Sequence, residues 1–266
     1  MQEQPLVSII TIVYNGEKHL QQTIESVLAQ SYKHIEYLVV DGGSTDNSLN
    51  IIRSFDDRIT AWKSEKDRGI SDAFNKGLAM AMGEIIGIIN ADDWYEPDAV
   101  EKAVGLIKDS DIVYGDLRLI KDGKSDFILK GDHKFLESEM TINHPTVFVR
   151  KTCYAQWGIF DEKYKCAMDY ELMLRFKTCG SQFRHIPFVL ANMRWEGMSD
   201  SKWLLGCQET LDIKNKYFPQ KKFSNRVYFY KHVFAIWISK FLARIRLGAI
   251  TRVYRSQVSR VKKIYD

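Results

Sequence analysis

The chain has 266 residues, of which 45% are hydrophobic and 27% are charged, and these fractions are ordinary for a globular protein. They exclude a disordered or fibrous chain, and the length suits one large α/β domain with an extension, or two modest domains. Four cysteines without CxxC spacing indicate neither a zinc site nor a disulfide framework, so we expect a reducing, cytoplasmic setting.

The net charge of +4 is divided unevenly along the chain. Residues 220–266 hold 12 of the 38 Lys and Arg residues and one of the 34 acidic residues, so this tail carries +11 and residues 1–219 carry −7. We expect the basic tail to meet an anionic surface. Its longest apolar run, VFAIWIS, is far shorter than the roughly 18 residues that cross a bilayer. The opening MQEQ lacks the positive residues of a secretory signal, so we expect no signal peptide.

The first part of the chain alternates predicted strands with predicted helices. In order, the pattern predicts a strand at 7–14, a helix at 17–30, a strand at 35–40, a helix at 45–54, a strand at 59–63, a helix at 71–83, a strand at 84–89 and a helix at 97–108. The strands are continuously apolar, which is typical of a parallel sheet covered by helices on both faces. We therefore expect a Rossmann-like α/β fold with a mostly parallel sheet.

After residue 110 the pattern changes. It predicts a hairpin around 121–123, helices at 151–157 and 167–179, a strand at 183–190 and a helix at 201–217. We expect residues 1–218 to form one domain and residues 219–266 a basic helical appendage.

The tail has the composition of a helix that lies on a membrane surface. A helical stripe of Val233, Ile236, Trp237, Phe241, Ile245 and Leu247 is interspersed with Lys and Arg. Such a helix binds anionic lipid through its apolar face and its charges. The alternative is that the apolar face packs on the domain or on another subunit. Nucleic acid also attracts basic tails, but the chain shows no nucleic-acid module, so we expect no nucleic-acid partner.

Polar residues gather where the predicted strands end. The groups are Thr11, Tyr14 and Asn15; Asp41 with Gly42 and Gly43; Asp67 to Gly69; and Asn90 with Asp92 and Asp93. Ligands of open parallel sheets bind beyond the carboxyl ends of the strands, so these groups predict one binding site. No GxGxxG motif is present, which argues against a dinucleotide fingerprint.

Asp92 and Asp93 place two like charges side by side at the end of a buried strand. Their repulsion and the cost of desolvating them predict a positive partner. Carboxylate oxygens suit Mg²⁺ or Mn²⁺, and such an ion would leave coordination positions for a diphosphate. The alternative is that one carboxylate caps the helix that follows.

Two further residues have a chemical and a structural interpretation. Asp169 lies in the first turn of the predicted helix 167–179, where an acid either complements the helix dipole or serves a reaction. Lys76 lies early in the predicted helix 71–83, where it either reaches a phosphate or is solvated.

Four segments resemble the successive motifs of family 2 glycosyltransferases with the GT-A fold: VSIITIVYNGEKHLQQTIESVLAQSY, EYLVVDGGSTDNS, SEKDRGISDAFNKGLAMAMGEIIGIINADDWYEPDAV and MDYELMLR. The resemblance covers about residues 6–200 in the family's order and spacing. It implies a nucleotide-sugar donor, commonly UDP-linked, a divalent metal (Mn²⁺ or Mg²⁺) and inversion at the anomeric carbon.

The resemblance also assigns roles to residues. Thr11, Tyr14 and Asp41, with Asn15 beside them, would hold the nucleobase, Asp67 would lie near the nucleoside, Asp92 and Asp93 would meet the ribose and the metal–diphosphate, and Asp169 would be the catalytic base. The chain has Asn90 where many relatives have an Asp, and Met168 where the family has a Glu before the base. His144 lies in the segment that lines the acceptor side in similar enzymes, and is otherwise a hydrogen-bonded loop residue. Trp195 either stacks on a sugar or packs.

We therefore expect transfer of a hexose or N-acetylhexosamine from a nucleotide sugar, with a UDP sugar as the expected donor, to a polyprenyl-linked or other glycan acceptor. The expected setting is bacterial surface-polysaccharide synthesis (O-antigen or capsule) on the inner face of the cytoplasmic membrane. The rival hypotheses are a nucleotidyltransferase on a related sheet and a non-catalytic sugar-nucleotide or carbohydrate-binding protein.

Overall fold

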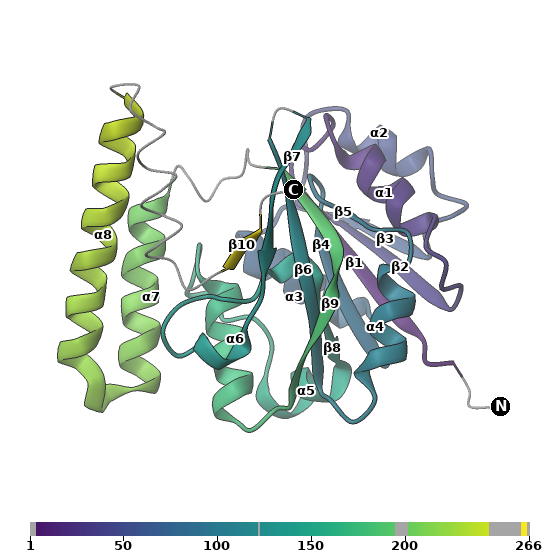
Figure 1. Ribbon diagram of the computed structural model, residues 1–266. Coiled ribbons are helices and arrows are strands. Elements are labelled where there is room, and N and C mark those ends of the chain that lie inside the picture. The colour runs from purple at the N-terminus through teal and green to yellow at the C-terminus, as the bar shows by residue number, and fades with distance from the viewer. Residues whose placement is uncertain (1–3, 122, 195–201, 245–261, 265–266) are drawn as a thin grey trace.

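The computed structural model describes residues 4–121, 123–194, 202–244 and 262–264. A mixed β-sheet runs through the molecule, and two helices, α7 and α8, stand side by side at one end of it (Figure 1). The strands and α-helices are β1 (Val7–Val13), α1 (Leu20–Leu28), β2 (Ile35–Asp41), α2 (Ser48–Arg53), β3 (Ala61–Ser64), α3 (Ile70–Met80), β4 (Ile85–Asn90), β5 (Trp94–Tyr95), α4 (Ala99–Ile107), β6 (Ile112–Lys121), β7 (Lys124–Lys130), β8 (Val147–Arg150), α5 (Lys151–Trp157), α6 (Met168–Thr178), β9 (Phe183–Arg194), α7 (Trp203–Tyr217), α8 (Lys222–Arg244) and β10 (Lys262–Ile264).

The sheet order is β10-β7-β6-β8-β4-β1-β2-β3, with β9 beside β6 and β5 beside β9. Strands β1 to β4 pair in parallel, whereas β8 runs antiparallel to both β4 and β6. In the parallel register Val13 is opposite Asp41, and Ile12 is opposite Asn90. The carboxyl ends of β1, β2 and β4 therefore meet at one edge, as the sequence predicted.

Apolar strands are buried on both faces because helices cover each side. One core lies between the sheet and α1, α2 and α4, and the other lies between the sheet and α3, α5 and α6. Gly77 lets α3 approach β1, because a Cβ there would lie 2.4 Å from Cγ2 of Ile10. We expect any larger residue at this position to push α3 away from the sheet.

Several sequence predictions need correction. The helix predicted at 17–30 begins at Leu20 and ends at Leu28. The strand predicted at 183–190 continues to Arg194, because it pairs with β6 and then with β5. The short strands β5 and β8 were not predicted. Residues 262–264 of the tail, predicted as part of a helical appendage, form a strand beside β7.

The C-terminal helices are fixed to each other by polar contacts. Asn225 Nδ2 donates to Asn215 Oδ1 over 3.1 Å, and Lys214 Nζ lies 3.7 Å from the centroid of the Tyr228 ring. Tyr228 also donates its hydroxyl to Glu139 Oε2 over 3.1 Å, in the segment between β7 and β8. The inner face of α8 is thus held against α7 and the sheet domain.

Candidate active site

The loop after β1 is tied to the loop after β2 by hydrogen bonds. The Asn15 N–H donates to Ser44 Oγ over 2.8 Å, and Asn15 Oδ1 accepts the Thr45 N–H over 2.8 Å. The Gly16 N–H donates to Ser48 Oγ over 2.9 Å. Asn15 has a φ of 51°, a left-handed conformation that Asn tolerates well. Its side chain joins the two loops, and its contact with a nucleotide stays a prediction.

Asp41 is buried at the end of β2, where its carboxylate organises the turn. It accepts the Ser64 hydroxyl over 2.6 Å, the Gly43 N–H over 3.2 Å and the Ser44 N–H over 3.1 Å. These donors use much of the hydrogen-bonding capacity of the carboxylate. The geometry gives Asp41 a structural part in the turn, and its contact with a nucleobase stays a prediction.

Tyr14, Gly42 and Asp67 come together beside this turn. A Cβ on Gly42 would lie 2.2 Å from Asp67 Oδ2 and 3.6 Å from the Cβ of Tyr14. The Tyr14 side chain is 63% exposed at this edge of the sheet, so its ring is available to a ligand. The predicted meeting of these three loops is confirmed by this packing.

Two further predicted nucleotide contacts, Thr11 and Lys76, have partners within the protein. Thr11 is fully buried in the middle of β1, where its hydroxyl accepts the Tyr37 O–H over 3.1 Å. Lys76 Nζ pairs with Glu65 at 3.1 Å and with Asp72 at 3.2 Å. The Thr11 side chain therefore faces the core, and the Lys76 charge is already paired with carboxylates. These contacts favour structural roles, and the contacts of both residues with a nucleotide stay predictions.

The acidic turn after β4 contains one exposed and one buried carboxylate. Asp92 is partly exposed, whereas Asp93 is 1% exposed and its Oδ1 has no hydrogen-bond partner among the described residues. Asn90 Nδ2 donates weakly to Asp93 Oδ2 over 3.5 Å. Burial, and then the charge of Asp92, raise the pKa of Asp93 well above its usual value.

A cation that the sequence did not reveal lies beside this turn. The Arg194 guanidinium donates to the main-chain oxygen of Asp92 and to Gln22 Oε1, and it lies 4.5 Å from the centroid of the Trp94 ring. Its charge also lowers the pKa of Asp93, against the larger effect of burial. Arg194 stands 102 residues from Asp92. The one sequence signal for it was a basic residue following the strand predicted at 183–190.

A divalent cation fits the acidic turn. Asp92 and Asp93 supply hard oxygen donors, and the buried oxygen of Asp93 has no protein partner in the described part of the chain. Among the residues that the structure describes, no group of three or more His, Cys, Asp or Glu side chains forms a metal site. Mg²⁺ commonly binds through one or two carboxylates together with substrate phosphates, and this turn suits that arrangement.

Asp169 lies in the first turn of α6, and it is partly buried. Burial raises its pKa to about 6. Its Oδ1 accepts the Tyr170 N–H over 2.7 Å, and its side chain lines a pocket of about 370 Å³. A carboxylate with this pKa is ionised at neutral pH and accepts a proton more readily than an exposed Asp. The arrangement therefore suits a general base.

Glu209 in α7 holds the chain that leads into α6, and the sequence gave no sign of this. It is buried, and its two carboxylate oxygens accept the N–H groups of Lys165, Cys166 and Ala167, each over 2.8 Å. These N–H groups precede the helix and have no partner within it. Glu209 thereby fixes the start of the helix that carries Asp169.

The variant Glu209→Gln should lower the free energy of unfolding by about 1–3 kcal/mol, because an amide group replaces an oxygen that accepts buried N–H groups. Urea denaturation would measure this loss. The control Asp212→Asn changes an exposed carboxylate of the same helix and should leave stability unchanged. Equal stability of Glu209→Gln and the wild type would contradict the inferred role of Glu209.

His144 lies between two aromatic rings. Its ring centroid is 5.2 Å from that of Phe74 and 5.9 Å from that of Phe160. Burial lowers the pKa of His144 to about 4, so it is neutral at neutral pH. This packing favours the structural interpretation, and an acceptor role stays a prediction. Trp195, the other predicted acceptor residue, lies outside the described residues.

The family model described as "Glycosyl transferase family 2" matches residues 8–171, more than half of the chain, and the chain belongs to this family. An uncharacterized glycosyltransferase of Rickettsia typhi is 33% identical over 195 residues, which are 67% of this chain and 61% of that relative. The chain thus spans about three fifths of that relative's length.

Solved structures confirm the fold. Residues 1–349 of Staphylococcus aureus TarS, in complex with UDP-GlcNAc, match with a TM-score of 0.65 and 18% identity over 78% of this chain and 65% of that one. The mannosyltransferase PcManGT from Pyrobaculum calidifontis, in complex with GDP-Man and Mn²⁺, matches with a TM-score of 0.66 and 19% identity over 97% of this chain and 77% of that one. The predicted GT-A-like α/β fold is therefore confirmed.

Proposed function

We propose that this chain is a metal-dependent, inverting glycosyltransferase that moves a hexose or N-acetylhexosamine from a UDP sugar to a hydroxyl of an acceptor. The observation that carries the proposal is Asp169, a partly buried carboxyl with a pKa of about 6 that opens on a pocket. Membership of family 2 supports the reaction class. The UDP-GlcNAc and GDP-Man bound by structural neighbours support a nucleotide-sugar donor.

In this mechanism Asp169 takes the proton from the acceptor hydroxyl. The hydroxyl oxygen forms a bond to C1 of the donor sugar as the bond from C1 to the diphosphate oxygen breaks, and the nucleoside diphosphate leaves. Asp92 and Asp93 would hold a divalent cation, which when bound neutralises charge on the diphosphate. Tyr14 and Asp67 flank the nucleoside at the Gly42 turn. Arg194 supports the acidic turn by donating a hydrogen bond to the main-chain oxygen of Asp92.

A panel of UDP and GDP sugars, incubated with the protein and Mn²⁺, tests this proposal. We expect nucleotide release from at least one UDP-hexose or UDP-N-acetylhexosamine, and loss of that release when a chelator removes the metal. A non-catalytic binding protein would bind UDP without releasing it from any donor. A nucleotidyltransferase would instead release pyrophosphate from a nucleoside triphosphate. Either of these outcomes would contradict the proposal.

We also propose that α8 attaches the protein to an anionic membrane surface, which would be the inner face of the cytoplasmic membrane. Phe223, Tyr230, Phe234, Trp237 and Phe241 are exposed along one side of the helix, with Trp237 stacked on Phe234 and on Phe241. The helix contains Lys and Arg but no Asp or Glu. Two copies of such a face would repel each other, so charge favours anionic lipid as the partner.

The exposed stripe differs from the predicted one. Ile236, which the sequence placed on the membrane side, lines the pocket on the inner face of α8. Ile245 and Leu247 lie outside the described residues. Across the described helices, none combines the length and hydropathy needed to span a bilayer. An acceptor held at the membrane fits a lipid-linked glycan of surface-polysaccharide assembly, such as O-antigen or capsule.

The double variant Phe234→Ser/Trp237→Ser should weaken binding to vesicles of phosphatidylglycerol and phosphatidylcholine by roughly 10-fold or more, because it removes two large apolar side chains from the lipid-facing side. Co-sedimentation with vesicles measures the effect. Met82→Ser, which removes an exposed apolar residue far from α8 in the chain, is the control. Equal vesicle binding by wild type and double variant would contradict the proposal.

A further inference from the structure

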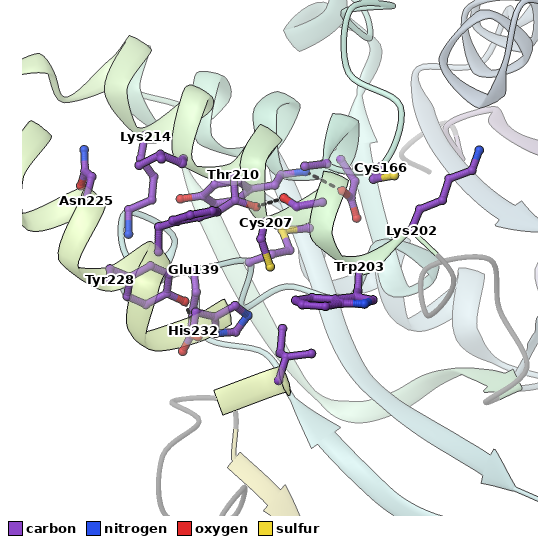
Figure 2. Close-up of a pocket in the computed structure, with 18 residues that line it drawn as sticks. Glu139, Cys166, Lys202, Trp203, Cys207, Thr210, Lys214, Asn225, Tyr228 and His232 are labelled. Carbon is purple, nitrogen blue, oxygen red and sulfur yellow. Dashed lines mark hydrogen bonds between the residues drawn. The ribbon is translucent and has the colours of Figure 1, made fainter. Parts of the chain in front are cut away.

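A pocket of about 370 Å³ lies between Asp169 and the inner face of α8 (Figure 2). Its walls come from the segment before β8, the start of α6, and helices α7 and α8. Figure 2 shows Trp203 between the side that carries Cys166 and Lys202 and the side that carries Tyr228 and His232. The volume is near the lower end of the roughly 300–1,000 Å³ that small-molecule sites occupy.

The wall of the pocket is fixed before any ligand binds. Tyr228 donates its hydroxyl to Glu139, and Lys214 donates to the main-chain oxygen of Ser138 over 2.8 Å while it packs on the Tyr228 ring. On the opposite side, Glu209 holds Cys166 and Ala167. A preformed cavity of this kind binds a ligand without a large ordering cost.

The lining combines aromatic and aliphatic groups with polar ones. Trp203, Phe229 and Ile236 supply apolar surface, whereas Lys202 and Thr210 supply hydrogen-bonding groups. A sugar ring matches this mixture, because its C–H face packs on an aromatic ring and its hydroxyls need polar partners when they are buried.

The pocket is continuous with α8, the helix that carries the exposed aromatic stripe. Phe229 and Ile236 line the pocket, and Tyr230 and Trp237, their neighbours in the chain, are exposed. One helix therefore separates the space beside Asp169 from the surface that we assign to lipid. An apolar group attached to a sugar in the pocket could lie along α8 with little apolar surface left in water.

We propose, on the basis of the glycosyl transfer proposed above, that this pocket is the acceptor site and that its ligand is a sugar with an apolar aglycone. The sugar presents a hydroxyl to Asp169 and packs against Trp203. The aglycone extends past Phe229 and Ile236 along α8. The C-terminal helices thus form part of the acceptor site in addition to any contact with the membrane.

The test measures binding without a donor, by saturation-transfer NMR and titration, with octyl glycosides of glucose, galactose, mannose and N-acetylglucosamine below micelle formation. At least one should bind the wild-type protein, and the matching methyl glycoside and octyl phosphate should bind at least roughly 10-fold more weakly. Gly206→Leu adds a side chain inside the pocket, where a Cβ meets Cys166 at an ordinary 3.6 Å. It should raise the dissociation constant roughly 10-fold or more.

Gln208→Leu is the matched control, because it adds the same side chain at an exposed position of α7 and should leave octyl glycoside binding unchanged. Thermal unfolding and UDP binding report whether each variant is folded. Trp203→Ala provides a second variant that enlarges the pocket instead of filling it, and it should also weaken binding.

Three results would overturn the inference: no octyl glycoside binds, Gly206→Leu and Trp203→Ala bind it as well as the wild type, or octyl phosphate or the methyl glycoside binds equally tightly.

The test is separate from the proposed function because no donor is present. If no nucleotide sugar releases its nucleotide while octyl glycosides bind the pocket, the transferase proposal fails and the binding site stands. If nucleotide is released but the expected octyl glycoside binding is not observed, only the acceptor-site inference is contradicted.

Discussion

Replacing Asp169 with asparagine should lower the rate of sugar transfer by roughly 10²–10⁴-fold, the usual contribution of a general base. The asparagine side chain has the same shape but cannot take the proton from the acceptor hydroxyl. Binding of UDP in the presence of Mn²⁺ should stay within about twofold of wild type, because Asp169 is assigned to the acceptor side. Nucleotide release measures the first effect, and calorimetric titration with UDP measures the second.

The pH dependence of the wild-type protein provides a second readout for Asp169. Burial raises the pKa of this carboxyl to about 6, so kcat/KM should fall as the pH drops below about 6 and level off above it. The low-pH limb should disappear from the residual activity of Asp169→Asn. Asp109→Asn, which alters an exposed carboxylate after α4, should retain the wild-type profile.

Stability checks that Asp169→Asn is folded. Because the pKa is raised in the folded chain, protonated Asp169 favours folding below its unfolded pKa of about 4, and this contribution is lost as the pH rises through about 6. Asparagine avoids burying the charge, so the variant should unfold at an equal or higher temperature than wild type at pH 7.5. A stable variant with near-normal turnover would exclude Asp169 as the base.

The variant Asp92→Asn should reduce kcat/KM by roughly 10²–10³-fold, because it removes a charged ligand of the cation that neutralises the leaving diphosphate. Unlike Asp169→Asn, it should also weaken Mn²⁺-dependent UDP binding. Raising the Mn²⁺ concentration should restore part of the lost activity. Asp57→Asn, an exposed carboxylate between α2 and β3, is the control and should behave as wild type.

Asp93→Asn separates the two carboxylates of the acidic turn. Burial and the charge of Asp92 raise the pKa of Asp93, so a neutral amide should leave folding intact while it removes a charged ligand of the cation. If both residues bind the cation, the two variants should lose UDP affinity to a similar extent. Normal Mn²⁺-dependent UDP binding by Asp92→Asn would contradict the metal assignment for this turn.

Local sequence patterns predicted those parts of the site in which polar residues follow the end of a strand. Asp41 and Asn90 lie at the same edge of the sheet because β2 and β4 pair in parallel with β1, and parallel pairing follows from apolar strands separated by helices. The burial of the Thr11 side chain could not be predicted, because a strand buried on both faces gives no alternation to show which way each side chain points. The pairing of Lys76 with Glu65 could not be predicted either, because Glu65 lies in a loop whose path the sequence did not reveal.

Residues that act across long stretches of chain were missed altogether. Glu209 accepts the N–H of Lys165, which is 44 residues away in the chain. In the sequence, Glu209 cannot be distinguished from the other polar residues of an amphipathic helix. Arg194 reaches the acidic turn because β9 extends to pair with β5, a strand of two residues that has no sequence signal of its own. Such contacts depend on how separate elements pack, and a local pattern carries no information on that packing.

The sequence by itself determined the family, the parallel part of the sheet, the acidic turn and the helix that carries Asp169, because a contiguous segment of the chain is enough to predict each of them. The tertiary structure alone decided which side chains face the site, which ones hold its loops, and that α7 and α8 build a pocket beside Asp169. The physical reason is burial: the raised pKa of Asp169, the burial of Asp93 and the pocket wall all arise where distant segments exclude water together.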